Sequence, residues 1–151
     1  TSKAKFCVSA TAMRDGMHLI CVIMAADTRD IRNAAATTLL DWGFANYALY
    51  VFEEADTGEL KVTGGVEDSV SLKARRFCCV VPKGSESKVE RFVEVRETTS
   101  APVKEGEVVG SIKFNIGNET IGTTDIVTAT RVDKIGFWQV FTRIFSYFLI
   151  A

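Results

Sequence analysis

The sequence has little proline, histidine or cysteine, and no excess of charge of either sign. Its 151 residues include 2 prolines, 1 histidine and 4 cysteines, and the formal net charge is -1. So little proline excludes a collagen-like or proline-rich linker protein. One histidine excludes a zinc site built from several histidines, and four cysteines are too few for a disulfide scaffold. The balanced charge lacks the basic footprint of a nucleic-acid-binding protein, so we expect no nucleic-acid partner.

What remains is the composition of a folded domain. Hydrophobic residues make up 47% of the chain and charged residues 25%, which are ordinary values for a globular protein. The length predicts one domain or two small ones. The chain begins at Thr1 rather than methionine and shows no leader pattern, so we expect a processed chain or an excised piece.

The first 45 residues predict a hairpin followed by a helix. Asp15-Gly16 favours a tight turn between two strand-like runs, in a register that places Ala10 opposite Cys21. Asp27-Thr28-Arg29-Asp30 offers several N-cap oxygens to a helix with apolar residues at helical spacing, and Gly43 is the expected residue just after its end. Both strands are apolar enough to be buried on two faces, so we expect a larger sheet around them.

Residues 46–131 change to short strand-like runs separated by turn residues. Gly64-Gly65, Pro82-Lys83-Gly84 and Gly117-Asn118 are among the separators. Strands at this regular spacing predict a small all-β sandwich or barrel. We take the sandwich, and the predicted fold class is an α+β fragment: a hairpin-plus-helix remnant, an all-β sandwich and a C-terminal amphipathic helix.

Residues 132–151 carry an aromatic, wide apolar face and a narrow polar stripe, which predicts an amphipathic helix. The stretch is too short to span a bilayer, so a position in the membrane interface suits it better. The alternative is a terminal helix that packs on the β module or on another chain. For the membrane interpretation the expected contact residues are Phe137, Trp138, Phe141, Arg143, Phe145 and Phe148.

None of the candidate chemical motifs predicts a site. His18 alone makes a catalytic triad improbable, and Cys78-Cys79 lies in a strand, where neighbouring side chains point to opposite faces. Ser85-Glu86-Ser87-Lys88 fits the Ser-x-x-Lys pattern, but that chemistry needs a partly desolvated lysine one helical turn from the serine. Here the pattern falls in a polar turn. We therefore assign no catalytic, cofactor-binding or metal-binding residue.

Several spaced motifs resemble one family in the correct order along nearly the whole chain. The family comprises the serine-type D-alanyl-D-alanine carboxypeptidases, the low-molecular-weight penicillin-binding proteins of peptidase family S11. The resemblance is carried by residues 4–12, 14–20, 40–47, 64–70, 82–84, 102–110 and 136–138.

The resemblance implies a transpeptidase-like catalytic domain contributing residues 1–45, an all-β domain at 46–131 and a membrane-associating amphipathic helix at 132–151. The implied reaction removes the terminal D-Ala of peptidoglycan stem peptides through an acyl-serine intermediate, at the outer face of the bacterial cytoplasmic membrane. The family's Ser-x-x-Lys, Ser-x-Asn and Lys-Thr-Gly motifs would all precede Thr1. We therefore expect this piece to have no carboxypeptidase activity, to bind no penicillin and to need no cofactor.

Two partners follow from the same interpretation, the peptidoglycan stem peptide for the parent protein and a membrane surface for residues 132–151. The alternative function is a non-enzymatic β interaction module that recruits cell-wall partners. An apolar hairpin and an aromatic tail also favour self-association of the piece.

Overall fold

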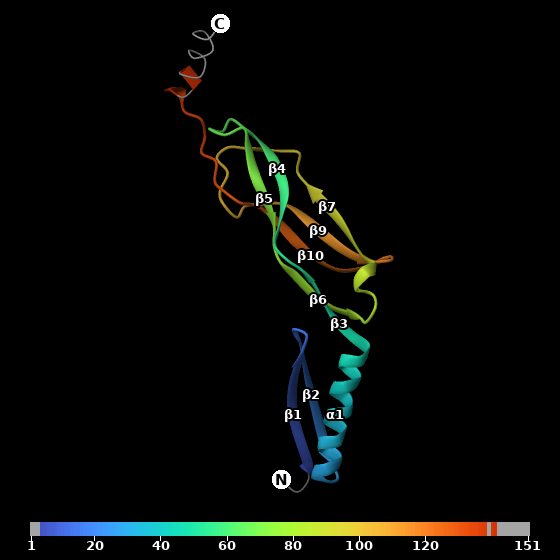
Figure 1. Ribbon diagram of the computed structural model, residues 1–151. Coiled ribbons are helices and arrows are strands. Elements are labelled where there is room, and N and C mark those ends of the chain that lie inside the picture. Colours follow the sequence, from blue (N-terminus) through green and yellow to red (C-terminus); the bar gives the residue numbers. More distant parts are fainter. Residues whose placement is uncertain (1–3, 139, 142–151) are drawn as a thin grey trace. The chain divides into compact units, whose positions relative to one another are not determined.

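The computed structural model describes residues 4–138, 140 and 141 (Figure 1). Ten strands and one long α-helix make up most of the regular structure of these residues, with a 3-10 turn at Glu86–Lys88 and a helical turn that includes residues 137, 138, 140 and 141. The chain divides into two compact units. Unit 1 comprises Thr1–Val51 and Cys78–Val89, and unit 2 comprises Phe52–Phe77 and Glu90–Ala151.

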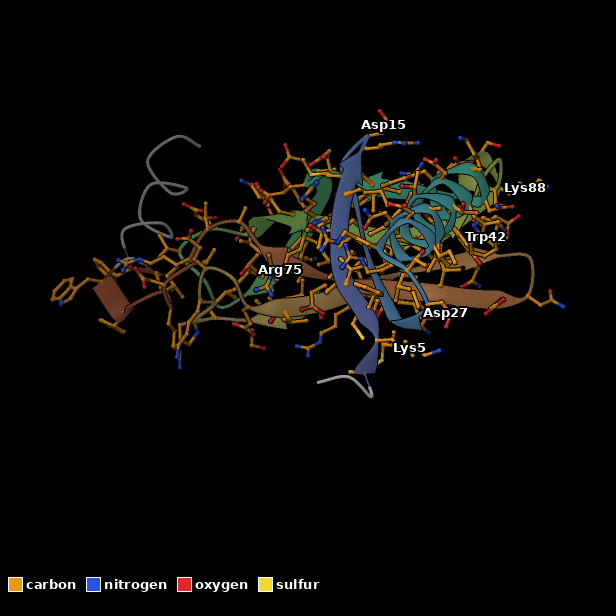
Figure 2. The ribbon with its side chains drawn as sticks, turned by 90° about the horizontal axis from the view of Figure 1, so that it is seen from below. Lys5, Asp15, Asp27, Trp42, Arg75 and Lys88 are labelled. Carbon is orange, nitrogen blue, oxygen red and sulfur yellow. The ribbon has the colours of Figure 1, made fainter. Side chains whose placement is uncertain are left out.

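Unit 1 is built on an antiparallel hairpin of β1 (Phe6–Arg14) and β2 (Met17–Ala26). Its register pairs Ala10 with Cys21, as predicted from the Asp15-Gly16 turn. In Figure 2 Asp15 lies at the turn, and Lys5 and Asp27 lie together at the open end, where an ion pair joins them.

Helix α1 (Arg29–Asn46) packs against β1 and β2 and covers one face of the hairpin. Thr28 caps its start by accepting a hydrogen bond from the Ile31 amide at 3.2 Å, as expected for an N-cap. The helix does not end at Gly43. A Cβ there would lie 2.6 Å from Leu19 Cδ1, so the glycine lets the helix approach β2 closely.

The other face of the hairpin is bare. Side chains alternate along β2, so Met17 and Cys21 are buried and Leu19 contacts α1, while His18 and Ile20 point away from the helix, as strand geometry requires. The exposed apolar side chains of this bare face are Met13, Ile20, Val22 and Met24. The expectation that both strands are buried on two faces is therefore not met by the described residues.

The chain passes from one unit to the other within two further strands. β3 (Tyr47–Phe52) and β6 (Phe77–Pro82) form a two-stranded sheet of their own.

Unit 2 contains one six-stranded sheet in the order β7-β9-β10-β5-β4-β8 (Figure 1). The strands are β4 (Ala55–Thr63), β5 (Ser69–Ala74), β7 (Val89–Val95), β8 (Thr98–Ser100), β9 (Val108–Ile116) and β10 (Glu119–Thr128). β4 pairs parallel with β8 and antiparallel with β5, and β10 pairs antiparallel with β5 and β9. A two-residue turn, Gly117-Asn118, joins β9 to β10.

The core of unit 2 is centred on Phe114 of β9, whose exposed fraction is 0%. The ring of Phe77 stacks on it with centroids 4.4 Å apart, and the ring of Phe52 lies 5.4 Å away. Alternate residues of β5, namely Val70, Leu72 and Ala74, are buried in the same unit. The period of two thus sets which face of the sheet is apolar.

The predicted fold class is wrong. The described chain is mostly β with α1 as its one long α-helix, and the structure does not support a hairpin-plus-helix remnant within an α+β fold. Of the strands after α1, six form one sheet, and β3 and β6 form a second sheet of two strands. Regular strand spacing indicates a β domain but does not say which strands pair.

The C-terminal amphipathic helix is likewise not shown. Residues 132–135 are extended, with bridges from Val132 to Val103 and from Lys134 to Gly65. A helical turn follows, in which the Val140 amide donates to the Gly136 carbonyl at 3.1 Å. Residue 139 and residues 142–151 of the expected helix lie outside the described residues. The spacing of apolar residues led to this error because it carries no information about the backbone pairing of residues 132–135.

Candidate functional site

Three exposed aromatic side chains lie together near the C-terminal end of the described residues. We call residues 136–141 the aromatic segment. Phe137 is 78% exposed, Trp138 is 74% exposed and Phe141 is 51% exposed. Trp138 contacts the other two rings edge-to-face, with centroids 6.1 Å apart in both pairs. Exposed apolar groups gathered in this way mark an interaction surface.

These three residues belong to the predicted membrane-contact set, and the structure brings them together. Arg143, Phe145 and Phe148, the other three members of the set, lie outside the described residues.

The aromatic segment is attached to unit 2 by a short extended stretch, residues 132–135, which we call the anchor strand. On one side, Val132 and Val103 exchange backbone hydrogen bonds of 2.8 and 3.0 Å. On the other side, the Val66 amide donates to the Asp133 carbonyl at 2.9 Å, and the Ile135 amide donates to the Gly64 carbonyl at 3.0 Å. The anchor strand is therefore held along both edges.

Close packing fixes the position of the anchor strand further. Val103 and Val132 are both buried. A Cβ at Gly65 would lie 2.7 Å from Val132 Cγ1 and 2.8 Å from the Glu67 carbonyl oxygen, so no larger residue fits. In the sequence, Gly64-Gly65 separates two strand-like runs and begins one of the motifs of the family resemblance. The adjacent glycines were the available signal that another segment approaches the backbone here.

Charged side chains surround the base of the aromatic segment. Arg131 forms an ion pair with Asp133 at 3.2 Å. Glu67 and Lys134 line, with these two, a shallow cavity of about 380 Å³. Aromatic rings beside cationic groups are the combination that interacts with lipid headgroups. Among the described residues, no helix is long and apolar enough to cross a membrane.

A second cavity, of about 490 Å³, lies in unit 1 beside the end of α1. The Arg14 guanidinium lies 4.7 Å from the ring centre of Phe44 and forms an ion pair with Asp41 at 2.8 Å. Lys83 donates from its backbone amide to the Asn46 carbonyl at 2.9 Å and from Nζ to the Phe44 carbonyl at 3.4 Å. Arg14 and Lys83 therefore already have partners within unit 1. Lys83 donates to carbonyl groups that α1 leaves unpaired at its C-terminus.

The remaining candidates from the sequence are Ser85, Lys88 and His18. Ser85 precedes the 3-10 turn Glu86–Lys88, and Lys88 is exposed to solvent (Figure 2). His18 is exposed on β2, opposite Met13.

The cysteines are free thiols, and they do not form a cluster. Cys21 is buried and Cys78 is exposed. Burial raises the pKa of the Cys79 thiol, and the neighbouring Cys78 raises it further. Within residues 4–138, 140 and 141, no group of three or more His, Cys, Asp or Glu side chains is placed to hold a metal ion.

Comparison with known proteins gives a consistent result. The family model described as penicillin-binding protein 5, C-terminal domain, matches residues 50–134. The D-alanyl-D-alanine carboxypeptidase DacF of Bacillus subtilis is 26% identical over 141 residues, and DacA of Haemophilus influenzae is 29% identical over 143 residues. Each match covers 91% of this chain but only 36% of the relative.

Solved structures agree with these matches. Penicillin-binding protein 5 from Haemophilus influenzae has a TM-score of 0.75 and 29% identity, over 89% of this chain and 40% of that one. A peptidoglycan synthesis regulatory factor (PBP3) from Streptococcus pneumoniae has a TM-score of 0.60 over 88% of this chain and 41% of that one. Its 22% identity shows a shared fold alone.

Proposed function

Because the chain belongs to the family of the penicillin-binding protein 5 C-terminal domain, we propose that it is the C-terminal part of a D-alanyl-D-alanine carboxypeptidase. The longer enzyme would remove the terminal D-Ala of peptidoglycan stem peptides at the outer face of the bacterial cytoplasmic membrane. This part would be non-catalytic and would attach the enzyme to the membrane surface. The names of the relatives support the reaction, and the chain spans about a third of the length of the first two.

The aromatic segment carries the membrane part of the proposal. Phe137, Trp138 and Phe141 expose most or half of their surface to water. Aromatic rings gain free energy at the headgroup level of a bilayer. The anchor strand joins this segment to the sheet of unit 2 through four backbone hydrogen bonds. Membrane contact would therefore be transmitted to a folded domain, which suits a spacer.

The bare face of the hairpin supports a separate role for residues 1–45. Ile20, Val22 and Met24 are exposed on one side of β2, and a two-stranded hairpin is marginal without a larger sheet. We propose that this face packs against the remainder of the enzyme's catalytic domain. The contact would bury apolar side chains that water now covers.

Vesicle co-sedimentation tests the membrane role. The full chain is mixed with vesicles of phosphatidylethanolamine and phosphatidylglycerol, and pelleted protein is measured. Replacing Phe137, Trp138 and Phe141 together by serine should weaken binding by about 100-fold, since partial burial of three rings supplies about 3 kcal/mol. Trp42→Ser is the matched control, because it removes an exposed aromatic ring from α1 in unit 1. It should bind as the unchanged chain does.

Two outcomes would contradict the proposal. Equal binding by the triple variant would show that the aromatic segment does not contact the membrane. Equal loss in the Trp42→Ser control would show that the assay responds to surface apolarity in general.

A further inference from the structure

Strand β7 ends the six-stranded sheet on one side, and no other strand of the described residues pairs with its outer edge (Figure 1). Exposed edge strands usually carry prolines, lysines or bulges that prevent pairing with another chain. β7 has the sequence VERFVEV, without proline or lysine, and its residues from Glu90 to Val95 are all exposed. Phe92 is 48% and Val93 is 59% exposed. An open edge with apolar side chains at its centre is suited to accept another strand.

Two contacts show which backbone groups of β7 point outward. The Arg96 amide donates to the Val109 carbonyl at 3.2 Å, on the side of β9. A Cβ at Gly110 of β9 would collide with the Glu94 carbonyl oxygen. Even-numbered residues therefore direct their amide and carbonyl groups toward β9. Because these groups alternate sides along a strand, those of Arg91, Val93 and Val95 point to the outer edge.

The charges of β7 select one register for a second copy of the same strand. An antiparallel pair about a two-fold axis at Val93 places the two Val93 residues opposite each other. It also places Glu90 of each copy opposite Arg96 of the other copy. An axis at residue 92 would set Glu90 against Glu94, and an axis at residue 94 would set Glu94 against itself, which is unfavourable. A two-fold axis between two residues would place each residue with outward-pointing backbone groups opposite a residue whose backbone groups point toward β9. No ladder of backbone hydrogen bonds would then form.

We propose that the outer edge of β7 is a self-association surface, which pairs antiparallel with β7 of a second copy of this chain about a two-fold axis at Val93. The pairing joins two sheets into one and, on one face, sets the two Val93 residues opposite each other and each Val95 opposite Arg91 of the other copy. Two Glu90–Arg96 ion pairs form on the other face. The strand is self-complementary in charge and shape, as an isologous interface requires. The proposal does not depend on the membrane role.

Sedimentation velocity of the full chain over a concentration series, at fixed salt, measures the dissociation constant of the dimer. Val93→Lys brings like charges together at the axis and should leave the fold intact, because the side chain is exposed. We expect the dimer dissociation constant to rise about tenfold or more. Val66→Lys is the matched control: it changes an exposed valine of unit 2 outside this edge and should leave the constant unchanged.

A charge exchange tests the register itself. Glu90→Arg alone and Arg96→Glu alone should each weaken the dimer, because each places like charges opposite one another. The double variant should restore it. A chain that remains monomeric at every concentration overturns the proposal, as does a dimer that persists in Val93→Lys. A dimer lost only when the rings of the aromatic segment are replaced by serine also overturns it, and assigns association to that segment.

Discussion

Replacing Phe114 by alanine should remove much of the stability of unit 2. Phe114 is fully buried and contacts Phe52 and Phe77 through ring centroids 5.4 and 4.4 Å away. Truncating a buried phenylalanine to alanine typically costs about 3–5 kcal/mol, from lost transfer free energy and the cavity left behind. That range already includes the lost aromatic contacts, which are worth about 0.5–1.5 kcal/mol each.

The neighbours of Phe114 decide how far the cavity can close. The ring of Phe77 lies against Gly122 of β10, where a Cβ would collide with it. Phe77 can move toward the cavity only by leaving this contact, so the refilling would be incomplete. We therefore expect a loss of about 4 kcal/mol, a large share of the roughly 5–15 kcal/mol that stabilises a typical domain.

Native-state hydrogen exchange measures this loss unit by unit. The amides of β9 and β10 should exchange about 1000-fold faster in Phe114→Ala, which corresponds to about 4 kcal/mol. Amides of α1, in unit 1, should keep their rates. Phe92→Ala is the matched control, since it truncates the same residue type at an exposed position of the same unit. An acceleration below about tenfold in β9 and β10 would refute the assignment of Phe114 to the centre of the core.

Two further predictions concern unit 1 and the thiols. Lys83→Ala should destabilise α1 by about 1 kcal/mol, because the Phe44 carbonyl loses the hydrogen bond from Nζ of Lys83. The loss is measured from the helical circular dichroism signal during a urea titration. An unchanged urea midpoint would contradict the capping role of Lys83. Because the pKa of Cys79 is raised, the folded state favours the neutral thiol of this residue. The contribution of Cys79 to the stability of the fold is therefore present below the ordinary cysteine pKa and is lost as pH rises through the folded-state pKa. At mildly alkaline pH, iodoacetamide should therefore label Cys78 before Cys79, as read by mass spectrometry, with the difference narrowing as pH rises; faster labelling of Cys79 would refute the argument.

Local signals predicted the start of the chain well. Asp15-Gly16 set the hairpin turn because both residues adopt positive φ, and the pairing of Ala10 with Cys21 followed by counting. Thr28 caps α1 as its position suggested. Gly43 was misassigned as the residue after the helix, since a glycine that allows close packing and one that ends a helix look alike in sequence.

Longer-range features could not be predicted in the same way. Strand spacing indicated a β domain but did not reveal that one sheet holds β4, β5 and β7–β10, because pairing partners depend on contacts distant in sequence. The anchor strand was assigned to a helix, although its residues pair with Val103 and with the turn at Gly64. Of the expected membrane-contact residues, Phe137, Trp138 and Phe141 gather as a group. Their contact with lipid stays a prediction.

The anchor strand also determines how a mechanical load would enter the domain. A pull on the aromatic segment, of the kind a tether to a moving surface produces, acts first on residues 132–135. Those residues are hydrogen-bonded along both edges, to Val103 on one side and to Gly64 and Val66 on the other. A force along the strand would strain these bonds together in shear instead of opening them one after another. The β domain would resist such a pull as a unit.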